Sequence, residues 1–177
     1  MKNKIFLSVL FAGLVSLSSC EKDESLDPLP LKLQGQYVKL DVSSDRLNFS
    51  DLPNAYFGGT LSVPSNNVVR YELFVRRELG SAPTADYKLL TTVTSFPHEL
   101  KVTPNDIAAA LEVDPSTLQN GDYYRFYAVS YDANGNKAQY RDLSRNIATE
   151  NTLEQAYRFR TVMTTDMVNV FNIYGGN

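Results

Sequence analysis

The sequence holds few residues whose types and spacing could support catalysis. His98 is the only histidine, and it follows Phe96-Pro97, which favours an exposed loop or a strand edge over the position of a general base. With one histidine and no nucleophile-elbow glycine pattern, a Ser-His-Asp triad cannot be assembled. Carboxylates are plentiful, but the sequence alone singles out no pair of them. We therefore expect no enzymatic activity.

Three oxygen-bearing side chains in one loop have the spacing of calcium ligands. Asp132, Asn134 and Asn136 occupy the first, third and fifth positions of such a loop. The sixth position, which requires glycine, is Lys137, and the twelfth, which requires glutamate, is Leu143. The Asn-Gly pair that begins at Asn134 is instead a strong signal for a tight hairpin turn. We predict a hairpin tip here and no metal site.

Cys20 is the only cysteine, and it could be a buried thiol, a nucleophile or a site of covalent modification. It follows Leu17-Ser18-Ser19, after a basic start and the apolar run 5–15, which is the pattern of a secretory signal. The four residues that end in this cysteine resemble a bacterial lipobox, whose cysteine sulfur is alkylated with diacylglycerol and becomes the new N-terminus. We predict that residues 1–19 are removed and that the lipid on Cys20 is the only covalent group, with no other cofactor.

The apolar run could also be read as a membrane span. It is too short for that, because a transmembrane helix needs about 20 apolar residues. Removal of the signal takes away Lys2 and Lys4, so the net charge of −3 becomes −5. A mildly acidic chain with no block of lysine or arginine argues against a nucleic-acid partner.

The residues after the cysteine predict where in the cell the protein is located. They are Glu21, Lys22, Asp23 and Glu24. This run resembles the short Lys-plus-acidic tag that directs outer-membrane lipoproteins of some Gram-negative bacteria to the cell surface, and the alternative is a solvated charged tether. With Pro28 and Pro30 downstream, residues 20–36 are expected to form a lipidated, extended tether. The resemblance implies a lipid-anchored outer-membrane protein that faces the cell exterior.

Period-two alternation dominates residues 37–165, which we predict to be one β-sandwich domain. Strands are expected at 37–42, 57–63, 69–76, 87–93, 124–130, 138–141 and 156–162. Thr103 is a plausible N-cap for a short helical insertion that begins at Pro104 and includes Leu111. Residues 166–177 are expected to form a further strand, of this core or of a partner's, or a tail.

One stretch is similar in spacing to the tyrosine corner and following strand of fibronectin type III domains. Its residues are Leu118, Gly121, Tyr124, Phe126, Ala128 and Gly135. The fold class implied is an all-β sandwich of the immunoglobulin or fibronectin type III kind. In that fold Tyr124 buries its ring and its hydroxyl donates a hydrogen bond to nearby backbone.

The order of the lipobox, the acidic tag and four further segments resembles the N-terminal domain of SusE-type surface lipoproteins. The segments are Phe57-Gly58-Gly59-Thr60, Tyr71-Glu72-Leu73, Ile107 to Leu111 and Tyr157-Arg158-Phe159-Arg160. Those lipoproteins accompany starch-utilisation-type importers, which consist of a barrel transporter and a lid lipoprotein. The resemblance implies a non-catalytic accessory subunit of a SusCD-type importer of a nutrient such as a glycan. The alternatives are a stand-alone glycan-binding lipoprotein and an adhesin-like or fimbria-like structural subunit.

A candidate binding surface follows from the strand that contains Tyr124. If Tyr124 and Phe126 face the core, alternate residues face outward, and two residues of the neighbouring strand join them. The set is Phe74, Arg76, Tyr123, Arg125, Tyr127 and Tyr131. We expect three exposed tyrosines to form a flat aromatic row, which suits sugar rings or a protein partner. Alternatively, another segment covers the row and makes it a second core. The absence of tryptophan disfavours a glycan, so we expect a protein partner.

Overall fold

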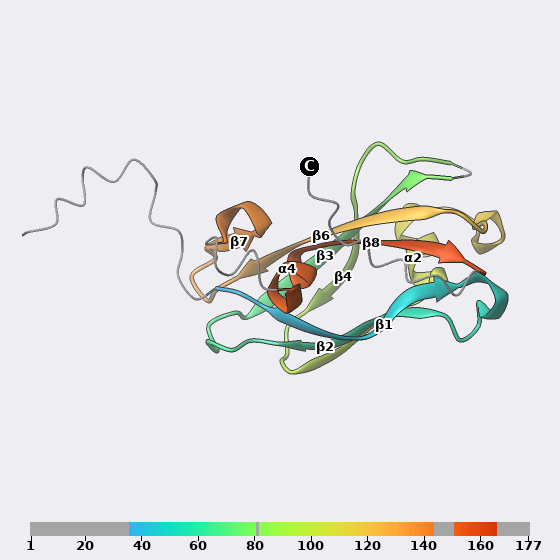
Figure 1. The fold of residues 1–177 in the computed structure, drawn as a ribbon. Helices are drawn as coiled ribbons and strands as arrows, with labels where there is room; N and C mark the ends of the chain where they lie inside the picture. The colour runs from blue at the N-terminus through green and yellow to red at the C-terminus, as the bar shows by residue number, and fades with distance from the viewer. Residues whose placement is uncertain (1–35, 81, 144–150, 166–177) are drawn as a thin grey trace, which may run out of the picture. The chain divides into compact units, whose positions relative to one another are not determined.

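The computed structural model describes residues 36–80, 82–143 and 151–165. The predicted signal, Cys20, the acidic tag, most of the predicted tether and the C-terminal segment 166–177 lie outside these ranges. The described residues form two facing layers of strands, and Figure 1 shows β1 and β2 in one layer and β3, β6 and β8 in the other. The prediction of an all-β sandwich with a short helical insertion is confirmed.

The first layer contains β1 (Lys39–Asn48), β2 (Tyr56–Ser62) and β5 (His98–Val102), in the order β1-β2-β5 and all antiparallel. The two glycines of β2 permit close strand contact, because a Cβ at Gly59 would lie 2.0 Å from the Asp41 carbonyl oxygen. A register shift in β1 lies opposite them, and glycine within a strand often marks such an irregularity. Strand β5 was not predicted, because only two apolar residues alternate in its five positions.

The second layer has the order β4-β3-β6-β8. Its strands are β4 (Lys88–Val93), β3 (Arg70–Leu79), β6 (Tyr123–Tyr131) and β8 (Arg158–Thr164), paired antiparallel. A short parallel pairing of β1 with β8, at Leu47 with Met163 and Asn48 with Thr164, joins the two layers. Three strands facing four, with the edges at β4 and β5, is an immunoglobulin-like arrangement.

The last strand of this layer is interrupted. The short β7 (Lys137–Gln139) and β8 pair with consecutive parts of the same strand, β6, and between them lie a 3-10 turn (Tyr140–Asp142) and α4 (Asn151–Tyr157). The prediction of a strand over 156–162 was therefore wrong at its start, and the strand predicted over 138–141 ends at Gln139. Leucine, glutamate, glutamine and alanine in α4 favour helix until the alternation begins.

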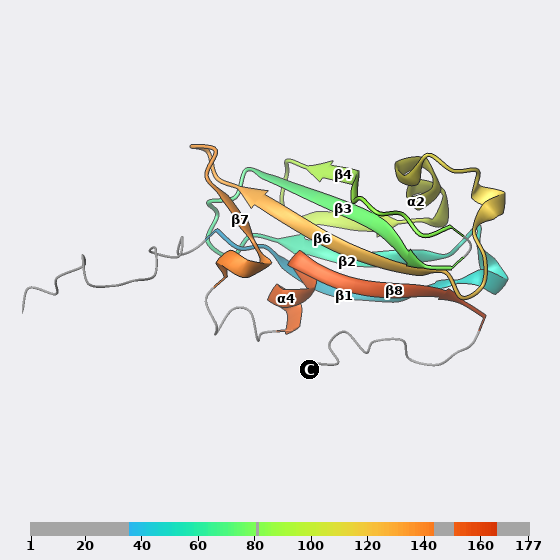
Figure 2. The ribbon, with the colours of Figure 1, turned by 90° about the horizontal axis from the view of Figure 1, so that it is seen from above.

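The predicted helix is α2 (Pro104–Leu111), with Thr103 as its N-cap as expected, and the structure adds a capping box with Asp106. The Thr103 hydroxyl accepts a hydrogen bond from the Asp106 amide at 3.2 Å, and the Asp106 carboxylate accepts one from the Thr103 amide at 2.8 Å. The helix buries Ile107, Ala108 and Leu111 against β4 and β3. Figures 1 and 2 both show it at one end of the sandwich.

Aromatic rings fill the space between the layers. Phe159 stacks on Phe57 at 4.1 Å and on Phe126 at 4.4 Å between ring centroids, and all three are at most 1% exposed. Tyr157 is also fully buried, so Tyr157 and Phe159 both point inward, as alternation over 156–162 would place them, although a helix ends between them. Alternation over the strand predicted at 69–76 would place Val69 on the inner face with Tyr71, but Val69 precedes β3 and is 47% exposed.

The Tyr157 hydroxyl forms hydrogen bonds with the backbone just before β1. It accepts a hydrogen bond from the Val38 amide, donates to the Gln36 carbonyl oxygen, each at 3.0 Å, and lies 2.8 Å from the Ser130 hydroxyl. Burial raises its pKa to about 12, although the hydrogen bonds from Ser130 and Val38 oppose the rise. Burial also raises the pKa of Tyr71. Folding therefore favours the neutral form of Tyr157 and Tyr71 over the ionised form.

We predict that alkaline pH destabilises the fold through these tyrosines. A pKa raised by folding gives stability that is complete below the unfolded value of about 10 and is lost as the pH rises toward 12, by up to about 1.4 kcal/mol per pH unit for each tyrosine. Tyr157→Phe should reduce the stability that is lost per pH unit by the amount that one tyrosine contributes. Urea unfolding at pH 8, 10 and 11 measures it, and equal slopes for the variant and the wild type would contradict the assignment.

Candidate functional site

The strand that contains Tyr124 has the predicted register. Tyr124, Phe126 and Ala128 are fully buried, while Arg125 and Tyr127 between them are half-buried on the opposite side. The hydroxyl of Tyr124 donates to the Asp122 carboxylate at 3.1 Å, and not to backbone as expected. Asp122 is itself buried and accepts a hydrogen bond from the Gln119 amide at 3.0 Å. The carboxylate lies between the ring and the backbone, and a charged acceptor makes the stronger bond.

Strand pairing places two rows of side chains on the outer face of the second layer. We call the first the aromatic row, in which Phe74 of β3 pairs with Leu89 of β4 on one side and with Tyr127 of β6 on the other. We call the second the arginine row, and it consists of Arg76, Arg125 and Arg160 on β3, β6 and β8. The two rows are adjacent, because their members are two residues apart on each of β3 and β6.

The rings of the aromatic row do not lie flat on the sheet. The rings of Phe74 and Tyr127 are stacked at 4.7 Å with 6° between their planes, which is close to the spacing of about 4.8 Å between neighbouring strands. Tyr87, just before β4, meets the Tyr127 ring edge-on at 4.6 Å. Parallel rings one strand apart stand on the sheet with their edges outward. The expectation of a flat row is therefore corrected: these rings cover one another and are not fully exposed.

The arginine row carries more positive than negative charge. Arg125 forms a two-point ion pair with Glu78, at 2.9 Å from Nε and 2.7 Å from Nη2. Arg76 reaches the same carboxylate at 3.3 Å and also lies over the Tyr87 ring at 4.8 Å. Among the described residues, no carboxylate forms an ion pair with Arg160, which lies directly opposite Arg125. One carboxylate thus serves two of three adjacent guanidinium groups.

Two of the predicted site residues lie outside these rows. Tyr131 donates to Glu72 at 2.9 Å and lies under Arg70 at 4.0 Å, and burial and Glu72 raise its pKa. Tyr123 pairs with Val162 at the other end of β6. The structure therefore brings together Phe74, Arg76, Arg125 and Tyr127, but not all three tyrosines.

Four residues of the face were missed from the sequence. They are Tyr87, Leu89, Glu78 and Arg160. A register shift between Leu73 and Phe74 decides which residue of β4 stands beside the aromatic row, and the pairing of β8 with β6 decides that Arg160 joins the arginine row. Alternation within each strand gave the outward direction, but no local signal gave these pairings.

Part of this face is open in the described structure. Leu89 is 51% exposed at the end of the aromatic row. Figure 2 views the layer from above, and no helix crosses β3 or β6 there. Val129, also on the outward side of β6, is only 7% exposed, so the end of the face near β7 is covered. The open part is therefore the middle of the face, at the two rows.

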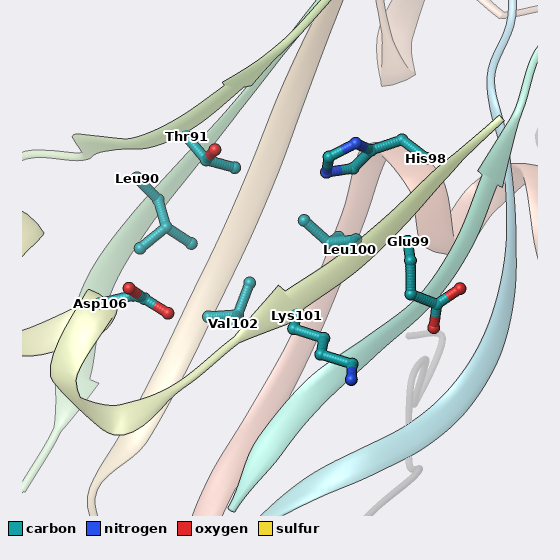
Figure 3. Close-up of a pocket in the computed structure, with 8 residues that line it drawn as sticks. All are labelled: Leu90, Thr91, His98, Glu99, Leu100, Lys101, Val102 and Asp106. Atoms are coloured by element: carbon teal, nitrogen blue, oxygen red, sulfur yellow. The ribbon is translucent and has the colours of Figure 1, made fainter. Parts of the chain in front are cut away.

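A hollow of about 200 Å³ lies between β4 and β5 (Figure 3). Leu100 and Val102 line it beside Leu90, with His98 toward one end and Asp106 toward the other. Figure 3 shows the imidazole and this carboxylate apart, with apolar side chains between them. His98 belongs to the edge strand β5, as its sequence position suggested. Because the imidazole and the carboxylate of this hollow are separated, we regard the outer face of the second layer, and not the hollow, as the candidate site.

Within the ranges that the structure describes, no three His, Cys, Asp or Glu side chains are grouped as metal ligands would be. Asp132 instead accepts hydrogen bonds from the amides of Asn134 and Asn136, as the predicted hairpin tip requires. In the same ranges no helix is long and apolar enough to cross a bilayer. No family model, curated protein or solved structure matches the chain.

Proposed function

We propose that this chain is a non-catalytic outer-membrane lipoprotein that docks a protein partner on its outer face. The partner we favour is a nutrient importer, with a barrel transporter and a lid lipoprotein, of which this chain would be an accessory subunit exposed at the cell surface. The observation that carries the proposal is the pair of adjacent rows, one aromatic and one of arginines, at the open middle of the second layer.

The composition of the face supports a protein partner. Aromatic residues and arginine are enriched at the centres of protein–protein interfaces, and the strongest contacts there come from rigid side chains that pack well. Phe74 and Tyr127 are already held by one another, and Tyr87 also holds Tyr127, so little side-chain freedom remains to be lost on binding. A preformed anchor of this kind suits docking.

Two further features agree with this role. A sugar stacks on the flat face of a ring, but Phe74 and Tyr127 turn those faces toward each other, which disfavours the alternative of a glycan-binding protein. In the sequence, the lipobox and the Pro-containing tether predict that the domain is held close to other membrane proteins. Such tethering raises the effective concentration of a partner in the same membrane.

We predict that Tyr127→Ala weakens assembly by about 2 kcal/mol or more, as loss of a central anchor does. The readout is the amount of transporter and lid lipoprotein that co-purifies with the full lipidated chain from solubilised outer membranes. Tyr127→Ala should also cost the isolated domain on the order of 1 kcal/mol, because the stacked contacts with Phe74 and Tyr87 are lost.

Tyr56→Ala is the matched control, since Tyr56 is also half-buried but lies on β2 in the first layer. It should leave co-purification unchanged. Equal recovery with wild type and Tyr127→Ala would refute docking on this face. If Tyr127→Ala lost glycan binding but kept its partner, and Tyr127→Phe still bound the glycan, the glycan-binding alternative would be favoured.

A further inference from the structure

We propose that the partner segment that docks on the outer face is acidic, and that its carboxylates pair with Arg76, Arg125 and Arg160. This inference rests on the proposed docking and specifies its chemistry. A guanidinium group binds a carboxylate in a two-point geometry, as Arg125 already does with Glu78, so the row is suited to Asp or Glu side chains.

The arrangement of charge indicates a missing anion. Arg125 and Arg160 are direct cross-strand partners, and like charges in that position destabilise a sheet. Glu78 offsets Arg76 and Arg125 together, while Arg160 forms no ion pair among the described residues. A ligand carboxylate placed between Arg125 and Arg160 would remove the repulsion.

The local charge is opposite to that of the whole chain. The full sequence has a net charge of −3, whereas the three arginines of this row and Glu78 together carry 3 − 1 = +2, so this row attracts an acidic partner although the chain as a whole does not. Such complementarity selects one orientation and disfavours other surfaces. By contrast Arg158, at the end of the aromatic row, is paired with Glu154 at 2.9 Å and lies over the Tyr140 ring at 3.6 Å. The excess charge is therefore local to the arginine row.

The adjacent aromatic row favours a peptide over an acidic polysaccharide. Leu89 is 51% exposed and Phe74 has no polar atom in its side chain, so this half of the surface needs apolar groups from its partner. The rings turn their edges outward and offer no open stacking platform for a sugar. A peptide with acidic and apolar side chains satisfies both rows.

A photo-crosslinker at Leu89 tests the inference in the full lipidated chain, in the cells that make it. Mass spectrometry of the crosslinked product identifies the bound segment. We expect a peptide with several Asp or Glu residues close to the crosslink. Arg160→Glu should lower the crosslink yield by about tenfold, because it replaces attraction with repulsion. Lys101→Glu makes the same charge change on β5 of the first layer and should leave the yield unchanged.

The decisive step is a charge exchange. Replacing an acidic residue of the crosslinked segment with arginine should restore the yield with Arg160→Glu, and the same replacement outside that segment should not, because a general electrostatic effect would not depend on position. A neutral or basic segment, a crosslinked sugar or lipid, or an unchanged yield with Arg160→Glu would each overturn the inference. Arg160→Gln provides a second variant if the reversal impairs folding, and its yield should lie between those of wild type and Arg160→Glu.

The two proposals can fail separately. If Tyr127→Ala lowers recovery of the complex but Arg160→Glu does not, the docking face stands and its acidic partner is wrong. If neither variant lowers recovery, both proposals fail.

Discussion

Asp122→Ala is expected to lower the free energy of unfolding by about 3 to 5 kcal/mol, as loss of one partner of a buried ion pair does. The Asp122 carboxylate and the Arg77 guanidinium group lie 3.5 Å apart, and each side chain is 1% exposed. The same carboxylate accepts hydrogen bonds from Tyr124 and from the Gln119 amide. The substitution would leave a buried positive charge without its closest countercharge and two donors without their acceptor.

Chemical denaturation at pH 7 measures this effect, and two further variants identify its cause. Tyr124→Phe removes only one hydroxyl and should cost about 1 kcal/mol. The double variant Arg77→Met with Asp122→Leu removes both charges and should be more stable than Asp122→Ala alone. If Asp122→Ala costs no more than Tyr124→Phe, the ion pair does not hold this end of the sandwich.

Cys20→Ala is expected to move the protein from the membrane fraction to the soluble fraction. The lipobox spacing predicts a diacylglycerol on this sulfur, and each buried methylene contributes about 0.8 kcal/mol to membrane binding. Without the thiol no lipid can be attached, and no helix of the described residues could replace it as a membrane span. Fractionation of cells followed by immunoblotting gives the distribution.

A variant with Glu21 and Asp23 replaced by alanine serves as the control for Cys20→Ala. It should stay with the outer membrane but lose exposure to protease added outside the cell, because only the predicted export tag is changed. If Cys20→Ala still sediments with outer membranes, the lipid anchor is wrong. If the control is as sensitive to external protease as the wild type, the prediction of an export tag is wrong. The prediction of a lipid anchor is not affected by that result.

Local patterns were sufficient for most elements of the sandwich. Alternation fixed which side of β6 is buried, because successive side chains of a strand point to opposite faces. Thr103 and Pro104 fixed the start of α2, since capping depends only on neighbours in the chain. Helix α4 was not predicted, because it is only seven residues long and runs directly into an alternating strand.

The contents of the candidate site depended on long-range pairing. The sequence by itself determined that Phe74, Arg76, Arg125 and Tyr127 face outward, because each direction follows from alternation within one strand. Only the tertiary structure decided that Leu89 and Arg160 stand beside them, that Glu78 is shared and that the rings stand on edge. Register between strands distant in sequence depends on bulges and on the packing of the whole core, which no short segment encodes.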